Sequence, residues 1–504
     1  MSREIINLEN VYYSYPHGKE WALENITLSI MEGEFLAVMG ENGAGKSTFC
    51  KLFNGIIPHH SGGRLLGTVT VDGESTEETP APLLALKAGI VLDDPDAQLF
   101  TSSVRHEAAF GPENLLLPPQ EIERRVEYSL AAAGLAGLEQ RQPATLSGGE
   151  KQRLAIAAAL AMKGKILTLD EPLSRLDPQG AAELMSVLKD IREKYQITVI
   201  MATHNSGKAV EFADRVCVLK NGSVIACDTA ENIFANRALL EDNGIQPPEP
   251  SAGRRRSGFL DDADIFAAFP VDAKEFSANE TKTPAIEITG FSYSYGKNAC
   301  IENVNLSIAD NDFTAVIGRN GCGKTTLLKN IAGLLRPSSG DIFIRGKNSR
   351  ELTISDISKE IGFVMQNPDT QLFTGSVYSE VSFALKNSGL SKTEIHRRAE
   401  NALCTVGLED RDAFPHALSR AGRTMTVLAS VLAMGCKIII LDEVDVGQDY
   451  PGSLKIMNIA RELHRQGFTI VFVTHNMSLV LEYAHRLIVM DRKGIVMDRK
   501  RDAK

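Results

Sequence analysis

The chain carries one set of motifs twice, and this repeat constrains the fold more than any other feature of the sequence. The segment Gly40-Glu-Asn-Gly-Ala-Gly-Lys46-Ser47 recurs 278 residues later as Gly318-Arg-Asn-Gly-Cys-Gly-Lys324-Thr325. Leu169-Asp170-Glu171 recurs 272 residues later as Leu441-Asp442-Glu443. Motifs that recur in the same order at nearly one separation predict two copies of one domain, not a solenoid of short repeats.

The segment between the two copies is predicted to be a linker. Residues 246–284 combine Pro247-Pro248-Glu249-Pro250 with clusters of charged residues, and they show little hydrophobic periodicity. Such a composition is typical of connecting segments. We therefore expect a first domain over residues 1–245 and a second over residues 285–504.

The composition of the chain argues against several classes of protein. The formal net charge is −10, so no basic surplus indicates nucleic acid as a bulk partner. No apolar run reaches the roughly 18 residues of a membrane-spanning helix, and the first residues do not resemble a signal peptide. The seven cysteines are scattered without a CxxC motif, which fits a reducing compartment and no cysteine metal site.

The motifs of each copy stand at the ends of short apolar runs, with helix-like segments between them. Buried strands that alternate with helices predict an α/β fold with a largely parallel sheet. Ligands of such sheets bind at the carboxyl ends of the strands. The expected strands are Phe35–Met39, Ile166–Leu169, Ile197–Ala202, Phe313–Ile317, Ile438–Leu441 and Thr469–Val473.

Each GxxxxGK[ST] motif follows a strand and precedes a helix, which is the pattern of a phosphate-binding loop. Its glycines let backbone N–H groups surround the phosphates, and the following helix adds its positive end. Lys46 and Lys324 are expected to neutralise phosphate charge, while Ser47 and Thr325 bind Mg²⁺. The loop residues expected to bind ATP are Gly40, Glu41, Asn42, Gly43, Ala44, Gly45, Lys46, Ser47 and Thr48, and Gly318, Arg319, Asn320, Gly321, Cys322, Gly323, Lys324, Thr325 and Thr326.

Paired acidic residues end a later strand in each copy. Asp170 and Asp442 are expected to help hold Mg²⁺. Glu171 and Glu443 follow directly and could polarise the water that attacks the terminal phosphate. Behind a phosphate loop at matching spacing, these pairs indicate ATP hydrolysis.

A third segment resembles the signature motif of the ATP-binding-cassette family: Leu146-Ser-Gly-Gly-Glu-Lys-Gln-Arg153. The resemblance implies that Ser147, Gly148, Gly149 and Glu150 complete the ATP site of the other domain, in a head-to-tail pair. It also implies an antiparallel β subdomain and a helical subdomain beside each parallel sheet.

Further residues match other motifs of that family. The resemblance places Tyr15 and Tyr295 where an aromatic ring stacks on adenine. His204 and His475 match a histidine that contacts the γ-phosphate. Gln366 matches a glutamine that serves catalysis and Mg²⁺.

A further repeated stretch resembles one particular group within this family. Asp94-Pro-Asp-Ala-Gln-Leu-Phe100 recurs as Asn367-Pro-Asp-Thr-Gln-Leu-Phe373, and it is similar to a segment in the ATPases of energy-coupling-factor and cobalt-type importers. The resemblance implies a surface that faces a membrane subunit, built from Gln98, Leu99, Phe100, Gln371, Leu372 and Phe373. The chain is then peripheral on the cytoplasmic face of the cell membrane. Its partners are a membrane-embedded subunit and a small substrate-binding membrane protein.

The two copies differ at two positions that bear on phosphate. The second copy has Arg420 and Ala421 where the first has Gly148 and Gly149, and the first has Asp93 where the second has Gln366. If the domains pair head to tail, both departures fall in one ATP site. We therefore expect one site that hydrolyses ATP and one degenerate site that binds ATP and turns it over slowly.

Two other functions fit parts of the pattern. A translation factor of the same family has tandem domains and binds ribosomes, but the acidic net charge and the altered second signature argue against it. A tandem ATPase of a sugar importer also has unequal halves, but the repeated Pro-Asp-x-Gln-Leu-Phe stretch is not expected there. For the importer, a vitamin, a vitamin precursor or a metal ion all fit as substrate.

Overall fold

The computed structural model describes residues 3–174, 176–248, 284–296, 298–491 and 494–501. The chain divides into two compact units, Met1–Gly258 and Phe259–Lys504. The division falls inside the predicted linker, most of which lies outside the described residues. Each unit is considered separately below.

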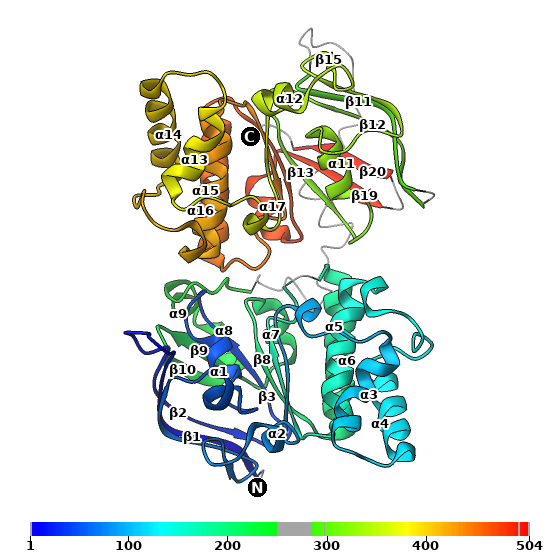
Figure 1. The fold of residues 1–504 in the computed structure, drawn as a ribbon, viewed down its shortest axis with the longest axis vertical. Coiled ribbons are helices and arrows are strands. Elements are labelled where there is room, and N and C mark those ends of the chain that lie inside the picture. Colours follow the sequence, from blue (N-terminus) through cyan, green and yellow to red (C-terminus); the bar gives the residue numbers. More distant parts are fainter. Residues whose placement is uncertain (1–2, 175, 249–283, 297, 492–493, 502–504) are drawn as a thin grey trace. The chain divides into compact units, whose positions relative to one another are not determined.

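Unit 1 contains two sheets (Figure 1). A four-stranded antiparallel sheet has the order β2-β1-β4-β5, and a six-stranded sheet has the order β10-β9-β3-β8-β7-β6. In the larger sheet β6, β7, β8, β3 and β9 pair in parallel, and β10 pairs antiparallel with β9. The strands are β1 (Glu4–Ser14), β2 (Leu23–Met31), β3 (Phe35–Met39), β4 (Arg64–Val71), β5 (Glu74–Ser75), β6 (Ala88–Val91), β7 (Ile166–Asp170), β8 (Thr198–Ala202), β9 (Arg215–Lys220) and β10 (Ser223–Thr229).

The longer helices of unit 1 gather away from its antiparallel sheet. Figure 1 shows α3, α4, α5 and α6 together on one side of the unit. The helices are α1 (Lys46–Cys50), α2 (Ala81–Leu84), α3 (Val104–Asn114), α4 (Pro119–Ala132), α5 (Gly148–Ala161), α6 (Pro178–Tyr195), α7 (Ser206–Phe212), α8 (Ala230–Ala235) and α9 (Arg237–Asp242). Short turns of other helix types are η1 (Ile56–His60), η2 (Pro95–Ala97) and η3 (Pro143–Thr145).

Unit 2 repeats this arrangement. Its sheets have the orders β12-β11-β14-β15 and β16-β17-β18-β13-β19-β20. Its strands are β11 (Ile286–Tyr295), β12 (Asn298–Ile308), β13 (Phe313–Gly318), β14 (Ser339–Ile344), β15 (Lys347–Asn348), β16 (Ile361–Val364), β17 (Ile438–Asp442), β18 (Thr469–Val473), β19 (Arg486–Asp491) and β20 (Gly494–Lys500). Its helices are α11 (Lys324–Ile331), α12 (Ile354–Glu360), α13 (Val377–Lys386), α14 (Lys392–Val406), η4 (Pro368–Thr370), η5 (Pro415–Ala417), α15 (Arg420–Ala433), α16 (Tyr450–Arg465) and α17 (Met477–Tyr483).

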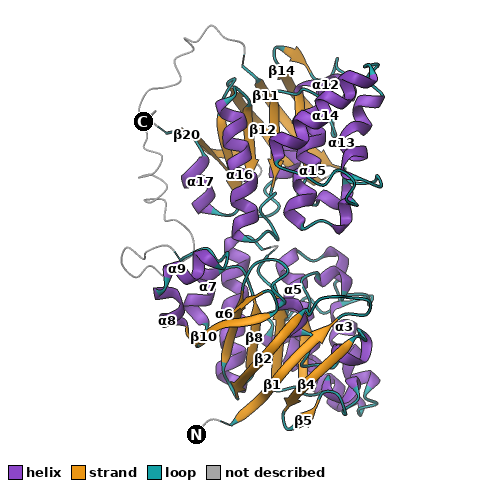
Figure 2. Ribbon diagram, turned by 90° about the vertical axis from the view of Figure 1, so that its left-hand side faces the viewer, coloured by secondary structure: helices purple, strands orange, loops and turns teal. Residues whose placement is uncertain are grey.

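The central strands form because they are apolar along their whole length. All residues of β3, β7, β8, β17 and β18 are buried, as expected for parallel strands that helices cover on both faces. Figure 2 shows the strands of each unit in orange and the purple helices that flank them. This layered arrangement brings the carboxyl ends of the strands, and the motifs that follow them, to one edge of each sheet.

The prediction of two α/β domains, each with an added antiparallel sheet and a helical part, is confirmed. Among the described residues, no helix is both long and apolar enough to cross a membrane.

Candidate nucleotide-binding sites

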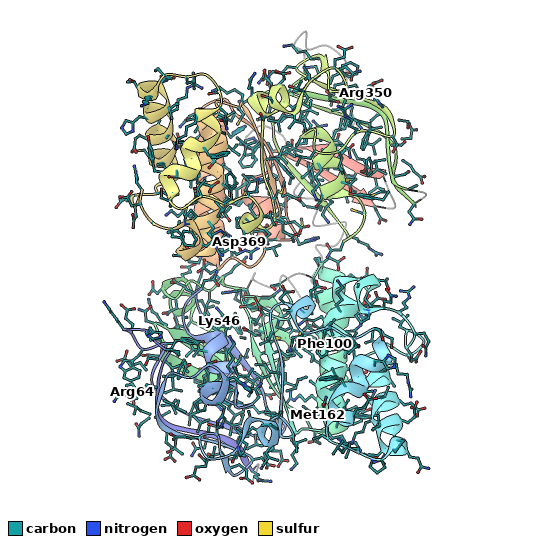
Figure 3. The ribbon with its side chains drawn as sticks, viewed as in Figure 1. Lys46, Arg64, Phe100, Met162, Arg350 and Asp369 are labelled. Carbon is teal, nitrogen blue, oxygen red and sulfur yellow. The ribbon has the colours of Figure 1, made fainter. Side chains whose placement is uncertain are left out.

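The phosphate loops of both units begin where a central strand ends. Lys46, labelled in Figure 3, opens α1, and Lys324 opens α11. The Lys46 ammonium donates to the carbonyl oxygens of Gly40 and Glu41 at 2.9 and 3.0 Å. Lys324 makes the same two bonds to its own loop at 2.9 and 3.1 Å. Both lysines are thus held inside the loop that they were predicted to serve.

The first glycine of each loop is required by its surroundings. Gly40 has a φ of 151° and Gly318 a φ of 153°. A Cβ at Gly40 would lie 2.2 Å from the carbonyl oxygen of Leu219, and one at Gly318 would lie 2.3 Å from that of Met490. Any larger residue would push the loop off the neighbouring strand, so these glycines let the backbone curl against the sheet.

A tyrosine stands beside each loop, as predicted for an adenine-binding ring. Tyr15 ends near Thr48, with 3.1 Å between the two hydroxyl oxygens, and Tyr295 ends 3.4 Å from the Thr326 hydroxyl. The two rings are 38% and 52% exposed. Aromatic rings that are this open have a free face for a nucleobase.

The strand-terminal aspartates fit a role in holding Mg²⁺. Asp170 is 3% exposed, and its Oδ1 is a buried atom without a hydrogen-bond partner. Asp442 is 2% exposed and accepts from the Thr325 hydroxyl at 3.2 Å. Burial raises the pKa of each carboxyl to about 6. A divalent cation would favour the ionised form of both groups and would occupy the unused lone pairs.

In unit 2 the predicted catalytic side chains converge on Glu443. The Gln366 amide donates to Glu443 Oε2 at 2.8 Å, and His475 Nε2 lies 3.2 Å from Oε1. Glu443 itself has a φ of 48°, a left-handed conformation that a glutamate rarely adopts. Such strain is common at functional sites. The glutamine, the glutamate and the histidine therefore form one cluster beside the phosphate loop.

Unit 1 assembles a different cluster around Glu171. His204 Nε2 lies 3.1 Å from Glu171 Oε1 and 3.2 Å from the Lys46 ammonium. Glu171 has a φ of 47°, so its backbone matches that of its counterpart. Asp93, at the position of the glutamine, is exposed.

The two glutamates differ in acidity. Burial raises the pKa of Glu171, and the charge of Asp93 raises it further, although Lys46 opposes both effects. Burial also acts to raise the pKa of Glu443, but the hydrogen bonds and charges of His475 and Lys324 together outweigh it and leave the pKa below its ordinary value. The pKa of Glu443 is thus lowered, whereas that of Glu171 is raised.

The signature segment of unit 1 opens α5 with a complete capping box. Ser147 accepts from the backbone N–H of Glu150, and the Glu150 carboxylate accepts from the backbone N–H of Ser147 at 2.7 Å. Such a box fixes the start of a helix. A Cβ at Gly148 would meet no atom within 4 Å, and one at Gly149 would meet only Leu176, at 3.7 Å. The fold of unit 1 does not require glycine at either place.

In unit 2 two arginines of the corresponding segment contact other residues of the same unit. The Arg420 guanidinium donates to the backbone carbonyl oxygen of Gln366 at 3.1 Å. Arg423 donates to both carboxylate oxygens of Asp369 at 2.8 and 3.0 Å. Within unit 2, therefore, Arg420 contacts the backbone of the residue whose amide holds Glu443.

The six residues of the predicted coupling surface differ in how far they are exposed. Leu372 is 5% exposed, and Leu99 is partly buried and packs against the core. The Gln98 amide oxygen accepts from the backbone N–H of Leu92 at 2.7 Å, and Gln371 makes the same bond to Met365 at 2.8 Å. All four side chains contact their own unit: the two glutamine amides are hydrogen-bonded to backbone groups, and the two leucines pack against the core. Phe100 and Phe373 remain on the surface, at 67% and 64% exposed.

Asp445 is a candidate functional residue that the motif analysis missed. It stands two residues after Glu443, where unit 1 has Leu173. Its Oδ2 accepts from the Thr474 hydroxyl at 2.6 Å, and Thr474 precedes His475. Burial raises its pKa to about 6. Alignment of the two copies could have found it, because a carboxylate in place of a leucine beside the predicted base is a marked change.

Replacement of Asp445 by asparagine should stabilise the nucleotide-free chain near neutral pH. The folded-state pKa of about 6 exceeds the ordinary aspartate value of 3.8, so stability is lost as the pH rises from about 4 to about 6. Asparagine keeps the acceptor for Thr474 and removes that cost, which is about 3 kcal/mol. Urea unfolding should show a gain at about pH 7.5 that disappears near pH 4.

The matched control for this experiment is Leu173→Asn in unit 1, which adds no titratable group. It should destabilise the chain by the same amount at both pH values. A gain from Asp445→Asn that does not change with pH would contradict the assignment.

These features define the class of domain that the chain contains. A phosphate loop that follows a central parallel strand, with an acidic pair at the end of a nearby strand, is the site of a P-loop nucleotide-binding domain, and this chain has two. A family model described as ABC transporter matches residues 23–174 and 301–445. The chain therefore belongs to the ABC transporter family, and its two domains are ATPase domains of that family.

Several proteins are similar to most of this chain. One from Methanosarcina mazei, named as an ABC transporter ATP-binding protein, is 37% identical over 98% of this chain and 88% of its own length. Another of the same description, from Caldanaerobacter subterraneus, is 35% identical over 97% of this chain and 90% of its own length. A solved structure of cbiO1 from Clostridium perfringens, part of the ABC transporter complex cbiONQ, has 36% identity and a TM-score of 0.43, and it aligns with 47% of this chain and 94% of its own.

Proposed function

We propose that the chain is the ATP-binding and ATP-hydrolysing subunit of a membrane importer of the energy-coupling-factor type. It would act as a peripheral protein at the cytoplasmic face of the cell membrane, with an integral membrane subunit and a small substrate-binding membrane protein as partners. A vitamin, a vitamin precursor or a metal ion fits as the transported substrate. The observation that carries the proposal is a pair of exposed aromatic rings in each unit, one on a loop (Phe100 or Phe373) and one on the helix that follows it (Phe110 or Phe383).

The aromatic pair is built twice with the same geometry. Phe100 stands edge-on to Phe110, with ring centroids 4.9 Å apart and planes at 90°. Phe373 and Phe383 repeat this at 4.7 Å and 88°. All four rings are between 43% and 67% exposed. Apolar groups that a soluble surface would not favour, placed identically in both units, support a docking site for an apolar partner.

In each unit, a buried glutamate fixes the loop that carries the first ring of the pair. The buried carboxylate of Glu107 accepts from the backbone N–H groups of Phe100 and Thr101, at 3.2 and 2.9 Å. Glu380 holds Phe373 and Thr374 in the same way, at 3.0 and 2.8 Å. A backbone held at two successive N–H groups keeps the ring in place for a partner, which lowers the entropic cost of docking.

The same loops are joined to the signature helices. In unit 1, Lys151 on α5 pairs with Asp96 at 2.6 Å, and in unit 2, Arg423 on α15 pairs with Asp369 at 2.8 Å. Asp369 and Phe100 are labelled in Figure 3. A helix that responds to ATP and a loop that meets the membrane partner are thereby linked, which supports transmission of movement between them.

The double variant Phe100→Glu, Phe373→Glu should lose its membrane partner and keep ATP binding. The tagged chain, purified from detergent-solubilised membranes of its own cell, should carry one large and one small integral membrane protein in wild type and neither in the variant. Loss of a buried aromatic anchor costs about 2 kcal/mol or more per ring. Mass spectrometry of the eluted proteins provides the measurement.

Leu116→Glu is the matched control, because Leu116 is an apolar side chain of the same unit that is 91% exposed. It should retain both partners. Co-purification of the double variant with the same membrane proteins would reject the docking surface, and recovery of ribosomes instead would favour a translation factor.

We further propose that the two ATP sites are unequal. In a head-to-tail pair, the signature Ser147, Gly148 and Gly149 would complete the site of Lys324 and Glu443. Open glycines that the fold of unit 1 does not require support this role, because bare backbone N–H groups suit an approaching phosphate. The site of Lys46 would instead meet the altered segment around Arg420 and would bind ATP with slow turnover.

Chemistry at the competent site would follow from the cluster around Glu443. The carboxylate would take a proton from the attacking water, and His475 and Lys324 would neutralise charge on the terminal phosphate. Thr325, Asp442 and Gln366 would hold Mg²⁺, which screens the phosphate oxygens. The Gln366 amide nitrogen already donates to Glu443, so its oxygen is the atom left for the metal.

A further inference from the structure

Two cysteines face each other across the hairpin of β9 and β10 in unit 1. Cys217 and Cys227 are direct partners in the antiparallel register, and both are free thiols. Cys217 is fully buried, whereas Cys227 is partly exposed. At the turn of this hairpin the backbone N–H of Gly222 donates to the carbonyl oxygen of Ala44 in the phosphate loop, at 3.0 Å. The pair therefore belongs to a hairpin that supports the ATP site.

An arginine contacts the more exposed of the two sulfurs. The Arg215 guanidinium donates to Cys227 Sγ at 3.1 Å and to Glu34 Oε1 at 3.1 Å. It also donates to the backbone carbonyl oxygen of Ser29 at 3.1 Å. The side chain is thus held by three contacts, and it presents a fixed positive charge to the sulfur.

Unit 2 has a carboxylate at the position that corresponds to Cys227. Arg486 corresponds to Arg215, and it donates to Asp498 Oδ1 and Oδ2 at 2.8 and 2.6 Å. Asp498 faces Ile488 in the register, just as Cys227 faces Cys217. Cys227 therefore stands where the other copy has a carboxylate bound to the corresponding arginine. The surroundings of Cys227 thus resemble those of an anionic group.

The charges around the pair favour a thiolate on Cys227. A hydrogen bond with Cys217 and the charge of Arg215 lower the pKa of Cys227, against its partial burial and the charge of Glu34. The same hydrogen bond, together with burial, raises the pKa of Cys217. By contrast, burial raises the pKa of Cys322, the cysteine in the phosphate loop of unit 2.

We propose that Cys227 is a reactive thiolate and that it forms, with Cys217, an oxidisable pair whose co-substrate is a hydroperoxide. Thiolates are the nucleophilic form of cysteine, and a cationic neighbour is the usual way in which proteins provide one. Directly opposed residues of an antiparallel pair have Cα atoms about 4.5 or 5.5 Å apart, which is within the range of about 4.4–6.8 Å for a disulfide.

The reaction balances in two steps. The Cys227 thiolate attacks one oxygen of the peroxide, the O–O bond breaks, hydroxide leaves, and Cys227 becomes a sulfenic acid. Cys217 sulfur then attacks the Cys227 sulfur, its proton leaves with the departing hydroxide as water, and the disulfide forms. Two thiols and one hydrogen peroxide thus give one disulfide and two waters.

The first test is the pH dependence of alkylation. The full chain is treated with iodoacetamide between about pH 5 and 9, and the peptide that contains Cys227 is quantified by mass spectrometry. Cys227 should react at a lower pH in the folded chain than in the same chain unfolded in urea. Arg215→Gln should shift the profile of the folded chain upward and make the reaction at neutral pH several-fold slower. A folded profile that coincides with the unfolded one, or lies above it, would overturn the proposal.

A second test covers the case in which Arg215→Gln does not fold. In wild type, hydrogen peroxide should give an intramolecular Cys217–Cys227 disulfide that dithiothreitol reverses. In Cys217→Ser, Cys227 should stop at the sulfenic acid, which a 1,3-diketone traps. In unit 2, Asp498→Cys should create a second acidic thiol beside Arg486. Failure of wild type to form the disulfide while other cysteines oxidise would refute the pair.

Discussion

Replacement of Glu443 by glutamine is expected to lower the ATPase rate of the assembled transporter by about 100-fold or more, because a general base contributes about 10²–10⁴-fold. Glutamine keeps the size of the side chain and can still contact Gln366 and His475, so the loss isolates the carboxylate. The matched variant Glu171→Gln should lower the rate by only about twofold, since the site of Glu171 is the one proposed to turn ATP over slowly.

Steady-state phosphate release in the complex purified from membranes provides the measurement for both variants, with nucleotide binding followed in parallel. Each variant should still bind ATP, because neither change alters a residue of a phosphate loop, and each phosphate-loop lysine keeps its bonds to two backbone carbonyl oxygens of its own loop. Equal loss of activity in the two variants would remove the proposed inequality, whichever site is the more damaged.

Substitution of Gly148 by arginine should be nearly as damaging as loss of the base. This change gives unit 1 the residue that unit 2 has at the same position. A Cβ at Gly148 would meet no atom within 4 Å, so the domain should fold normally, with an unchanged midpoint of thermal unfolding. The arginine would instead fill the space for the γ-phosphate, and the ATPase rate should fall by about 100-fold, as when an anion-binding donor is lost.

The reverse change, Arg420→Gly, is the control. It should leave the ATPase rate within about threefold of wild type, because the site proposed to turn ATP over slowly would still contain Asp93. Some loss is expected in place of a gain, since Gln366 loses the guanidinium that holds its backbone. A normal rate in Gly148→Arg would show that the signature of unit 1 does not meet a phosphate.

Residues whose role follows from local backbone geometry could be predicted from the sequence. The phosphate loops need glycine at fixed spacing and a strand before them, so Gly40, Lys46 and their counterparts were placed correctly beside the sheet. The acidic pairs at the ends of β7 and β17 followed from the same pattern. Repetition of each motif removed the chance of an accidental match.

Residues whose role depends on which way a side chain points could not be placed in this way. The Gln-Leu-Phe stretch suggests three surface residues, yet only the phenylalanine points outward, because the glutamine closes the loop and the leucine enters the core. Likewise the sequence shows only that Arg420 replaces a glycine of the signature, whereas the structure shows that its guanidinium donates to the Gln366 carbonyl within unit 2. Long-range contacts of this kind arise from packing, which spacing along the chain does not encode.

The ion pairs that join the signature helices to the aromatic loops have a consequence for the history of the chain. Both units have such a pair, Lys151 with Asp96 and Arg423 with Asp369, although only unit 1 has the glycines in front of it. One helix thus has two separable duties, and after duplication the second copy could give up one and retain the other. If the two sites are unequal as proposed, the halves of this protein are not interchangeable, and a chain with two identical halves would not reproduce its activity.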